Sequence, residues 1–172
     1  MSQKTNIDPG CPMTIQLGST LPSGKFGVMT PDGPGSITTE ALFGGQMVVV
    51  FSVPGAFTPT CSMAHLPGFV RHADELKAKG VDTVACLSVN DTWVMDAWGR
   101  DQDVGDKVMM LADGNATFTK ALGLLVDLSA GGMGVRGQRF AMIVDDGIVS
   151  HLAIEAPREF TVSSAEEMLK VL

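Results

Sequence analysis

The chain has 172 residues, the length of one domain, and we expect a single domain over residues 1–172. Hydrophobic residues make up 45% of the chain and charged residues 18%, so it can bury a sizeable core and is not disordered. The net charge of −7 disfavours binding to nucleic acid or to an anionic membrane, because phosphate groups repel an acidic protein.

The first half of the chain contains a strongly apolar strand followed by an amphipathic helix. Turns rich in Gly and Pro divide residues 1–45, where we expect short strands near Met13–Leu17 and Phe26–Met29. The run at Gln46–Val53 is continuous and β-branched, which is typical of a central strand buried on both faces. Apolar residues then recur at helical spacing over Cys61–Lys79, where Pro67 is predicted to kink the helix.

The second half alternates strands with short helices and ends in a hairpin and a helix. The predicted elements are strands at Val81–Val89 and Lys107–Leu111, a helix through Trp93 and Trp98 capped by Asn90 or Asp91, a helix at Ala116–Leu122, a hairpin of Arg139–Val144 and Ile148–Ile154, and a helix from near Ser163 with Glu166 at capping-box spacing. This order predicts an α/β protein with a thioredoxin-like fold. Its mixed sheet would be parallel at the centre and antiparallel at one side, with helices on both faces.

The segment between the apolar strand and the next helix carries the candidate site. Such sheets place active-site residues at the carboxyl ends of their central strands. Cys61 falls in the first turn of the helix, where unpaired N–H groups and the positive end of the helix dipole favour a thiolate. Thr58 offers a nearby hydroxyl, and Pro54 and Pro59 stiffen the loop. The pattern indicates a reactive thiol rather than an inert buried one.

The motif P-x-x-x-T-x-x-C at Pro54, Thr58 and Cys61 resembles the signature of the peroxiredoxins. The longer run VPGAFTPTCSMAHLPGF at Val53–Phe69 closely resembles the type II (atypical) peroxiredoxins, which include mammalian peroxiredoxin V and the plant type II enzymes. The similarity continues through Cys86–Trp98 and Arg136–Asp146 and covers roughly residues 13–172.

This resemblance implies a thiol peroxidase that needs no metal, haem or flavin. Cys61 would be the peroxidatic thiolate, which attacks hydrogen peroxide or an organic hydroperoxide and becomes a sulfenic acid. Thr58 would orient the peroxide, and Pro54 would shape the loop. Arg136 would hold the thiolate and polarise the peroxide, because the family pattern places an arginine four residues before Phe140. On the residues alone, Arg139 is a rival.

Other features of this region have alternative interpretations. The glycine segment at Gly131–Gly134 also resembles a phosphate cradle, but no P-loop or dinucleotide spacing accompanies it. A metal site of Cys61, His65 and His72 is geometrically possible but matches no familiar zinc pattern. We favour His65 as a pocket-wall residue that orients the loop, and Phe57 as a pocket residue or dimer contact. Trp93 and Trp98 are expected to be packing residues.

The remaining cysteines bear on how the sulfenic acid is reduced. Mammalian members of the family carry a resolving cysteine near the C-terminal helix, where this chain has Phe160–Ser164. Cys86 stands at the spacing of the plant resolving cysteine, but it lies within a predicted strand, and we favour a buried core thiol. Cys11 has no family counterpart. These features predict recycling by glutathione, glutaredoxin or thioredoxin. The resemblance also implies a homodimer.

Two other functions are compatible with this fold. A disulfide oxidoreductase would share the fold but needs C-x-x-C, which Cys61 lacks. A non-catalytic binding or chaperone module would not need the intact set of Pro54, Thr58, Cys61 and Arg136 that this chain carries. The odd, low cysteine count fits a reducing compartment, and Met1–Gly10 lacks the apolar region of a secretory signal. No apolar run approaches the roughly 18 residues of a membrane span. We therefore expect a cytoplasmic protein.

Overall fold

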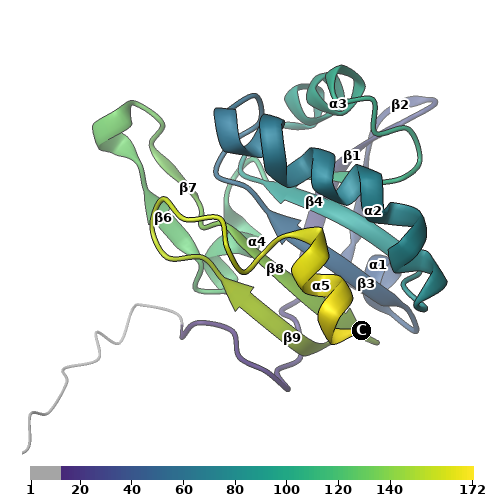
Figure 1. Ribbon diagram of the computed structural model, residues 1–172. Helices are drawn as coiled ribbons and strands as arrows, with labels where there is room; N and C mark the ends of the chain where they lie inside the picture. The colour runs from purple at the N-terminus through teal and green to yellow at the C-terminus, as the bar shows by residue number, and fades with distance from the viewer. Residues whose placement is uncertain (1–12) are drawn as a thin grey trace, which may run out of the picture.

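The computed structural model describes residues 13–172 and is built on a seven-stranded mixed sheet (Figure 1). Across the sheet, the strands are β2 (Gly33–Thr38), β1 (Lys25–Thr30), β5 (Met109–Ala112), β4 (Thr83–Ser88), β3 (Met47–Ser52), β8 (Phe140–Asp145) and β9 (Ile148–Ile154). β3, β4 and β5 run parallel, whereas β8 is antiparallel to β3 and β9 is antiparallel to β8. The predicted α/β, thioredoxin-like architecture is confirmed.

The sheet is antiparallel on both sides of its parallel centre, whereas the sequence predicted this on one side only. β1 pairs antiparallel with both β5 and the edge strand β2. β2 has the sequence GPGSIT, which contains no apolar alternation, and its proline is tolerated because the strand lies at the edge. The strand predicted near Met13–Leu17 is not formed. Instead, the Ile15 N–H donates to the Leu122 carbonyl at 2.8 Å.

Helices cover both faces of the sheet (Figure 1). They are α1 (Thr39–Phe43), α2 (Leu66–Ala78), α3 (Thr92–Asp101), α4 (Thr117–Ala121) and α5 (Ala165–Val171). α2, α3 and α5 pack on one face, and α1 and α4 on the other. α1 is too short to show a helical period in the sequence. No helix within residues 13–172 has the length and apolar character needed to cross a bilayer.

The cap of the last helix differs by one residue from the one predicted. Ser164, not Ser163, caps α5 by accepting the Glu167 N–H at 3.2 Å. At the start of α4, Asp113 accepts the N–H groups of Phe118 and Thr119 at 3.2 and 2.8 Å. The Asp91 cap of α3 is confirmed by its 2.9 Å bond from the Val94 N–H.

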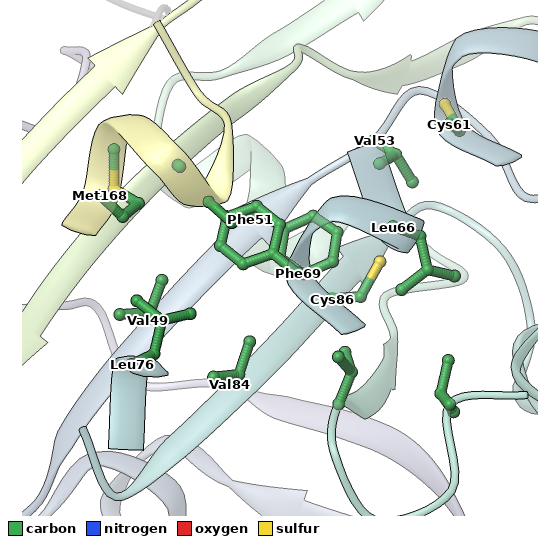
Figure 2. Close-up of a cluster of buried hydrophobic side chains, with 14 of the residues drawn as sticks. Val49, Phe51, Val53, Cys61, Leu66, Phe69, Leu76, Val84, Cys86 and Met168 are labelled. Carbon is green, nitrogen blue, oxygen red and sulfur yellow. The ribbon is translucent and has the colours of Figure 1, made fainter. Parts of the chain in front are cut away.

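Alternate residues of β3 point into two buried clusters. Val49 and Phe51 pack beneath α2 and α5, and Val48 and Val50 pack toward α1 and α4. Figure 2 shows Phe51 stacked against Phe69 of α2. Their ring centroids are 4.0 Å apart and their planes differ by 3°. This contact fixes α2, and the turn before it, against the strand that leads into the candidate site.

A π-helical turn, η1 (Cys61–His65), precedes α2 in place of the single kinked helix that was predicted. The Leu66 N–H donates to the Cys61 carbonyl, which is the wide i to i+5 pattern. Pro67 has no N–H to donate and stands at the start of α2, a position where proline is tolerated. Cys61 is therefore the first residue of a widened turn.

Candidate active site

The end of β3 and the end of β4 hold the loop that carries Cys61. The Val53 N–H donates to the Leu87 carbonyl at 3.1 Å, and the Ser88 hydroxyl donates to the Val53 carbonyl at 3.2 Å. Beyond β4, the Asn90 side-chain oxygen accepts the Ala56 N–H at 3.0 Å. The loop is thus tied to the carboxyl ends of two parallel strands, where such sheets build their sites. Asn90 was predicted only as a helix cap.

Cys61 is fully buried at the start of η1, and Thr58 braces the loop before it. The Thr58 hydroxyl donates to the Gly55 carbonyl at 2.8 Å, and the Thr58 carbonyl accepts the Ser62 N–H at 3.0 Å. These bonds form a tight turn immediately before η1. Thr58 and Pro54 are both half-buried, on the segment that the sequence predicted to be the site.

The arginine that contacts the Cys61 sulfur is Arg139. The sequence predicted Arg136 in this place, and the contacts of Arg136 do not include the sulfur. Arg139 Nη2 donates to Cys61 Sγ at 3.1 Å. Arg136 instead donates from Nε to the Met133 carbonyl at 2.9 Å and from Nη1 to the Pro54 carbonyl at 3.3 Å.

The strand register explains this difference between the two arginines. Arg139 immediately precedes Phe140, which pairs with Ser52 at the very end of β3, so its side chain starts beside the loop that follows β3. Arg136 lies in a separate ribbon formed by β6 (Leu125–Asp127) and β7 (Val135–Gly137), which extends away from the main sheet in Figure 1. From there, Arg136 reaches the Pro54 carbonyl of the loop.

His65 lies between Arg139 and the segment before α5. His65 Nδ1 is 2.8 Å from Arg139 Nη1, and Nε2 is 2.8 Å from the Ser163 carbonyl. Because a guanidinium can only donate, Nδ1 accepts and Nε2 carries the proton. Burial, and then the charge of Arg139, lower the pKa of His65 from 6.5 to about 3, so the ring is neutral.

The hydrogen bonds of His65 and His72 involve the nitrogens that the alternative metal site of Cys61, His65 and His72 would need. Both ring nitrogens of His65 already have partners, which leaves neither free to bind a metal. His72 bonds to Glu75 at 2.9 Å and to Glu166 at 3.1 Å. Within residues 13–172, no group of three or more His, Cys, Asp and Glu side chains is arranged to hold a metal ion.

Aromatic side chains flank the loop on its other side. Phe57 is 53% exposed, has a positive φ of 63°, and its ring lies 6.5 Å from that of Trp98. Trp98 is buried, as predicted, and donates from Nε1 to the Ser62 hydroxyl at 3.0 Å. Trp93 was also predicted to pack, but it is 63% exposed. Phe57 therefore presents its ring to solvent at the edge of the site.

Cys86 is a buried free thiol on β4. It belongs to the same apolar cluster as Cys61, and Figure 2 shows both sulfurs on the α2 side of the sheet. Burial, and then the proximity of Cys61, raise the pKa of Cys86 well above its ordinary value. Cys86 is therefore protonated and unreactive in this arrangement. Cys11 lies outside the described residues.

A pocket of about 600 Å³ opens beside the arginine. Pro54, Thr60 and Arg139 form the side nearest Cys61, and Val126, Leu128 and Pro157 contribute an apolar wall. Phe160 closes another side, with its ring centroid 5.9 Å from the Arg139 guanidinium carbon and 4.8 Å from the His65 ring.

Glu155 also lines this pocket, although the sequence did not predict it. It follows β9 directly and is only 6% exposed, although it is charged. Its only signal in the sequence is its position at the end of an apolar strand, LAIE, which is too common to single it out. It connects to the site through the segment that ends at Ser163.

Comparison with known proteins relates this chain to the peroxiredoxins. The redoxin family model matches residues 16–169. Peroxiredoxin-2E, chloroplastic, of Arabidopsis thaliana is 47% identical over 163 residues, covering 92% of this chain and 70% of the relative. Peroxiredoxin-2E-2, chloroplastic, of rice is 51% identical over 164 residues, covering 92% of this chain and 73% of the relative.

The fold is also similar to that of a solved peroxiredoxin structure. Reduced Prx3 of Vibrio vulnificus in complex with hydrogen peroxide superposes with a TM-score of 0.89 at 52% identity. The superposition covers 92% of this chain and 99% of that chain.

The expectation of a cytoplasmic location is contradicted by these comparisons. It rested on the cysteine count and the polar start of the chain, which indicate a reducing compartment but do not distinguish one such compartment from another. The relatives from Arabidopsis and rice described above are both named as chloroplastic proteins.

Proposed function

Because this chain belongs to the redoxin family and is a type II peroxiredoxin, and hence a thiol peroxidase, we propose that Cys61 is its peroxidatic cysteine. The observation that carries the proposal is the 3.1 Å contact from Arg139 Nη2 to Cys61 Sγ. A guanidinium at this distance from a buried sulfur favours the thiolate, which is the nucleophilic form.

The reaction is a displacement at oxygen. The Cys61 thiolate attacks one peroxide oxygen, an S–O bond forms and the O–O bond breaks. The leaving oxygen departs as hydroxide or alkoxide and takes up a proton, giving water or an alcohol, while Cys61 becomes a sulfenic acid. In this proposal Arg139 stabilises the negative charge on both the sulfur and the leaving oxygen. Thr58 hydrogen-bonds the incoming peroxide, and Pro54 with Arg136 holds the loop in place.

The substrates we propose are hydrogen peroxide and organic hydroperoxides. The relative from Vibrio vulnificus was solved with hydrogen peroxide, which supports the first. The apolar wall of the 600 Å³ pocket beside Arg139 supports the second, because it can accept the hydrocarbon part of an alkyl hydroperoxide. Peroxide would approach along the side formed by Pro54, Thr60 and Arg139.

We propose that an external thiol reduces the sulfenic acid. Cys86 is buried and protonated, and the segment Phe160–Ser164 before α5 contains no cysteine. Glutathione, glutaredoxin or thioredoxin would therefore attack the sulfenic sulfur and release water, leaving a mixed disulfide for a second thiol to reduce. The exposed Phe57 and Met63, on either side of Cys61, support a homodimer that buries this edge of the site.

Peroxide consumption by single variants tests the proposal. With a thiol reductant present, the protein should consume hydrogen peroxide, the Cys61→Ser variant should not, and Cys86→Ser should retain most of the activity. The Cys86 variant is the matched control, since it removes a thiol from the same apolar cluster. Equal activity in the Cys61→Ser variant would overturn the proposal, and a failure of the unaltered protein to consume peroxide would favour a non-catalytic binding module. Replacing glutathione with glutaredoxin or thioredoxin then identifies the electron donor.

A further inference from the structure

Glu155 is a buried carboxylate whose bonding is concentrated on one oxygen. Its Oε1 accepts the N–H groups of Thr161, Val162 and Ser163, each at 2.8 Å, and the Ser163 hydroxyl at 2.8 Å. Burial pushes the pKa of Glu155 upward, but the bonds from these three residues outweigh it, so the pKa lies below its ordinary value. An ionised carboxylate therefore folds the segment before α5 around itself.

The segment that Glu155 holds ends in the carbonyl that fixes His65. The Ser163 carbonyl accepts from His65 Nε2 at 2.8 Å, which keeps the ring proton on that nitrogen. Nδ1 is then free to accept from Arg139 Nη1 at 2.8 Å, and the same guanidinium donates from Nη2 to Cys61 Sγ at 3.1 Å. Glu155 also anchors Arg139 through the backbone, because its N–H donates to the Arg139 carbonyl at 3.0 Å.

We propose that Glu155 is a positioning residue that sets the Arg139 guanidinium against the Cys61 sulfur, acting through the Ser163 carbonyl and the His65 ring. The inference rests on the proposed function, which makes the Cys61 thiolate the nucleophile. It assigns a role to a residue that touches neither the sulfur nor the peroxide. The carboxylate orders the loop, the loop fixes the histidine tautomer, and the histidine holds one edge of the guanidinium so that the other edge meets the sulfur.

The direction in which Glu155→Gln moves the Cys61 titration distinguishes a positioning role from a direct effect of the Glu155 charge. Removing a negative charge near a thiol favours its thiolate, so a purely coulombic effect of Glu155→Gln moves the Cys61 titration to lower pH. Loss of the Arg139 contact removes a positive charge from the sulfur and moves the titration to higher pH. The proposal predicts the upward shift.

The test is the ultraviolet absorbance of the thiolate as a function of pH, with the curve of the matching Cys61→Ser variant subtracted. In Glu155→Gln, the midpoint should rise by about one pH unit, which is about tenfold less thiolate on the acid side of the transition. Glu159→Gln is the matched control. Glu159 is exposed, lines the same pocket and makes no side-chain hydrogen bond within residues 13–172. Its midpoint should not rise. An unchanged or lowered midpoint in folded Glu155→Gln overturns the proposal.

A double-mutant cycle tests the path through His65. In the His65→Phe background, Glu155→Gln should raise the titration midpoint almost no further, because both changes break the same chain of contacts from Glu155 to Arg139. A full, additive shift in the double variant would contradict the path. If Glu155→Gln fails to fold, Ser163→Ala removes one of the four donors to Glu155 Oε1 and keeps the carbonyl. It should raise the midpoint by a smaller amount, and no rise would equally contradict the proposal. Because the titration uses no peroxide, it stands even if the peroxidase assay fails.

Discussion

Arg139 donates a hydrogen bond to the sulfur of Cys61 across 3.1 Å, from a position directly before the strand that pairs with the end of β3. Arg136 lies three residues earlier in the chain but reaches only the carbonyls of Met133 and Pro54. The two arginines therefore have different tasks. In the proposed mechanism, Arg139 stabilises charge at the sulfur, and Arg136 holds the loop through the Pro54 carbonyl.

Replacing each arginine by lysine should separate these tasks. Arg139→Lys removes the planar fork that meets both His65 and Cys61, and we expect kcat/KM for hydrogen peroxide to fall by about 100-fold or more. Arg136→Lys weakens the bond to the Pro54 carbonyl and should cost only a few-fold, on the order of one lost hydrogen bond. Steady-state peroxide consumption by the two purified variants gives the comparison. A larger loss in Arg136→Lys would reverse the assignment.

Cys86 should be dispensable for catalysis. Cys86→Ala leaves a small cavity in the apolar cluster and should lower the free energy of unfolding by about 1 kcal/mol, while peroxide consumption is retained. Urea denaturation and the peroxidase assay measure the two effects on one preparation. If the Cys86→Ala variant lost turnover with thioredoxin while its Cys61 still reacted normally with peroxide, Cys86 would be the resolving cysteine.

His65 should make the protein acid-sensitive. Its pKa is lowered to about 3 by burial and by the charge of Arg139, so between pH 6.5 and 3 the unfolded chain takes up a proton that the folded protein does not. Stability should therefore fall on acidification through this range, by about 1.4 kcal/mol per pH unit from this group alone.

Denaturation midpoints across this pH range check the slope, and His65→Phe should flatten it. His72→Gln is the control. Hydrogen bonding to Glu75, and then to Glu166, outweighs burial and raises the pKa of His72, so below pH 6.5 it is protonated in both the folded and the unfolded chain. Its removal should leave most of the acid slope in place. An unaltered slope in His65→Phe would contradict the account of the buried neutral ring.

The stack of Phe51 on Phe69 should carry much of the stability around the site. Both rings are fully buried, with centroids 4.0 Å apart. Phe69→Ala should lower the free energy of unfolding by about 3–5 kcal/mol, because it opens a cavity between β3 and α2. Chemical denaturation measures this directly. A loss below about 1 kcal/mol would mean that the surrounding side chains collapse into the space.

The sequence predicted the parts of the fold that have strong periodicity. The run at 46–53 became β3, the hairpin became β8 and β9, and the helix after Cys61 became η1 and α2. β2 and α1 were not predicted, because an edge strand of Gly and Pro and a helix of five residues have no hydrophobic pattern. The π-helical form of η1 also left no signal, apart from Pro67 in the following turn.

The candidate site was predictable where the chemistry is local in the sequence. Pro54, Thr58 and Cys61 lie on one loop, and their motif is recognisable. The arginine was misplaced because its position depends on where β7 ends and β8 begins, a register that residue spacing does not reveal. Glu155 could not be predicted, since the role proposed for it depends on the segment that folds back over it.

One measurement tests most directly whether Cys61 is the thiolate that peroxide oxidises. The protein is treated with an equimolar amount of hydrogen peroxide, and its intact mass and peptide map are recorded. We predict that one oxygen atom is added on Cys61 while Cys86 remains a free thiol. An unmodified Cys61, with the peroxide left in solution, would contradict the account.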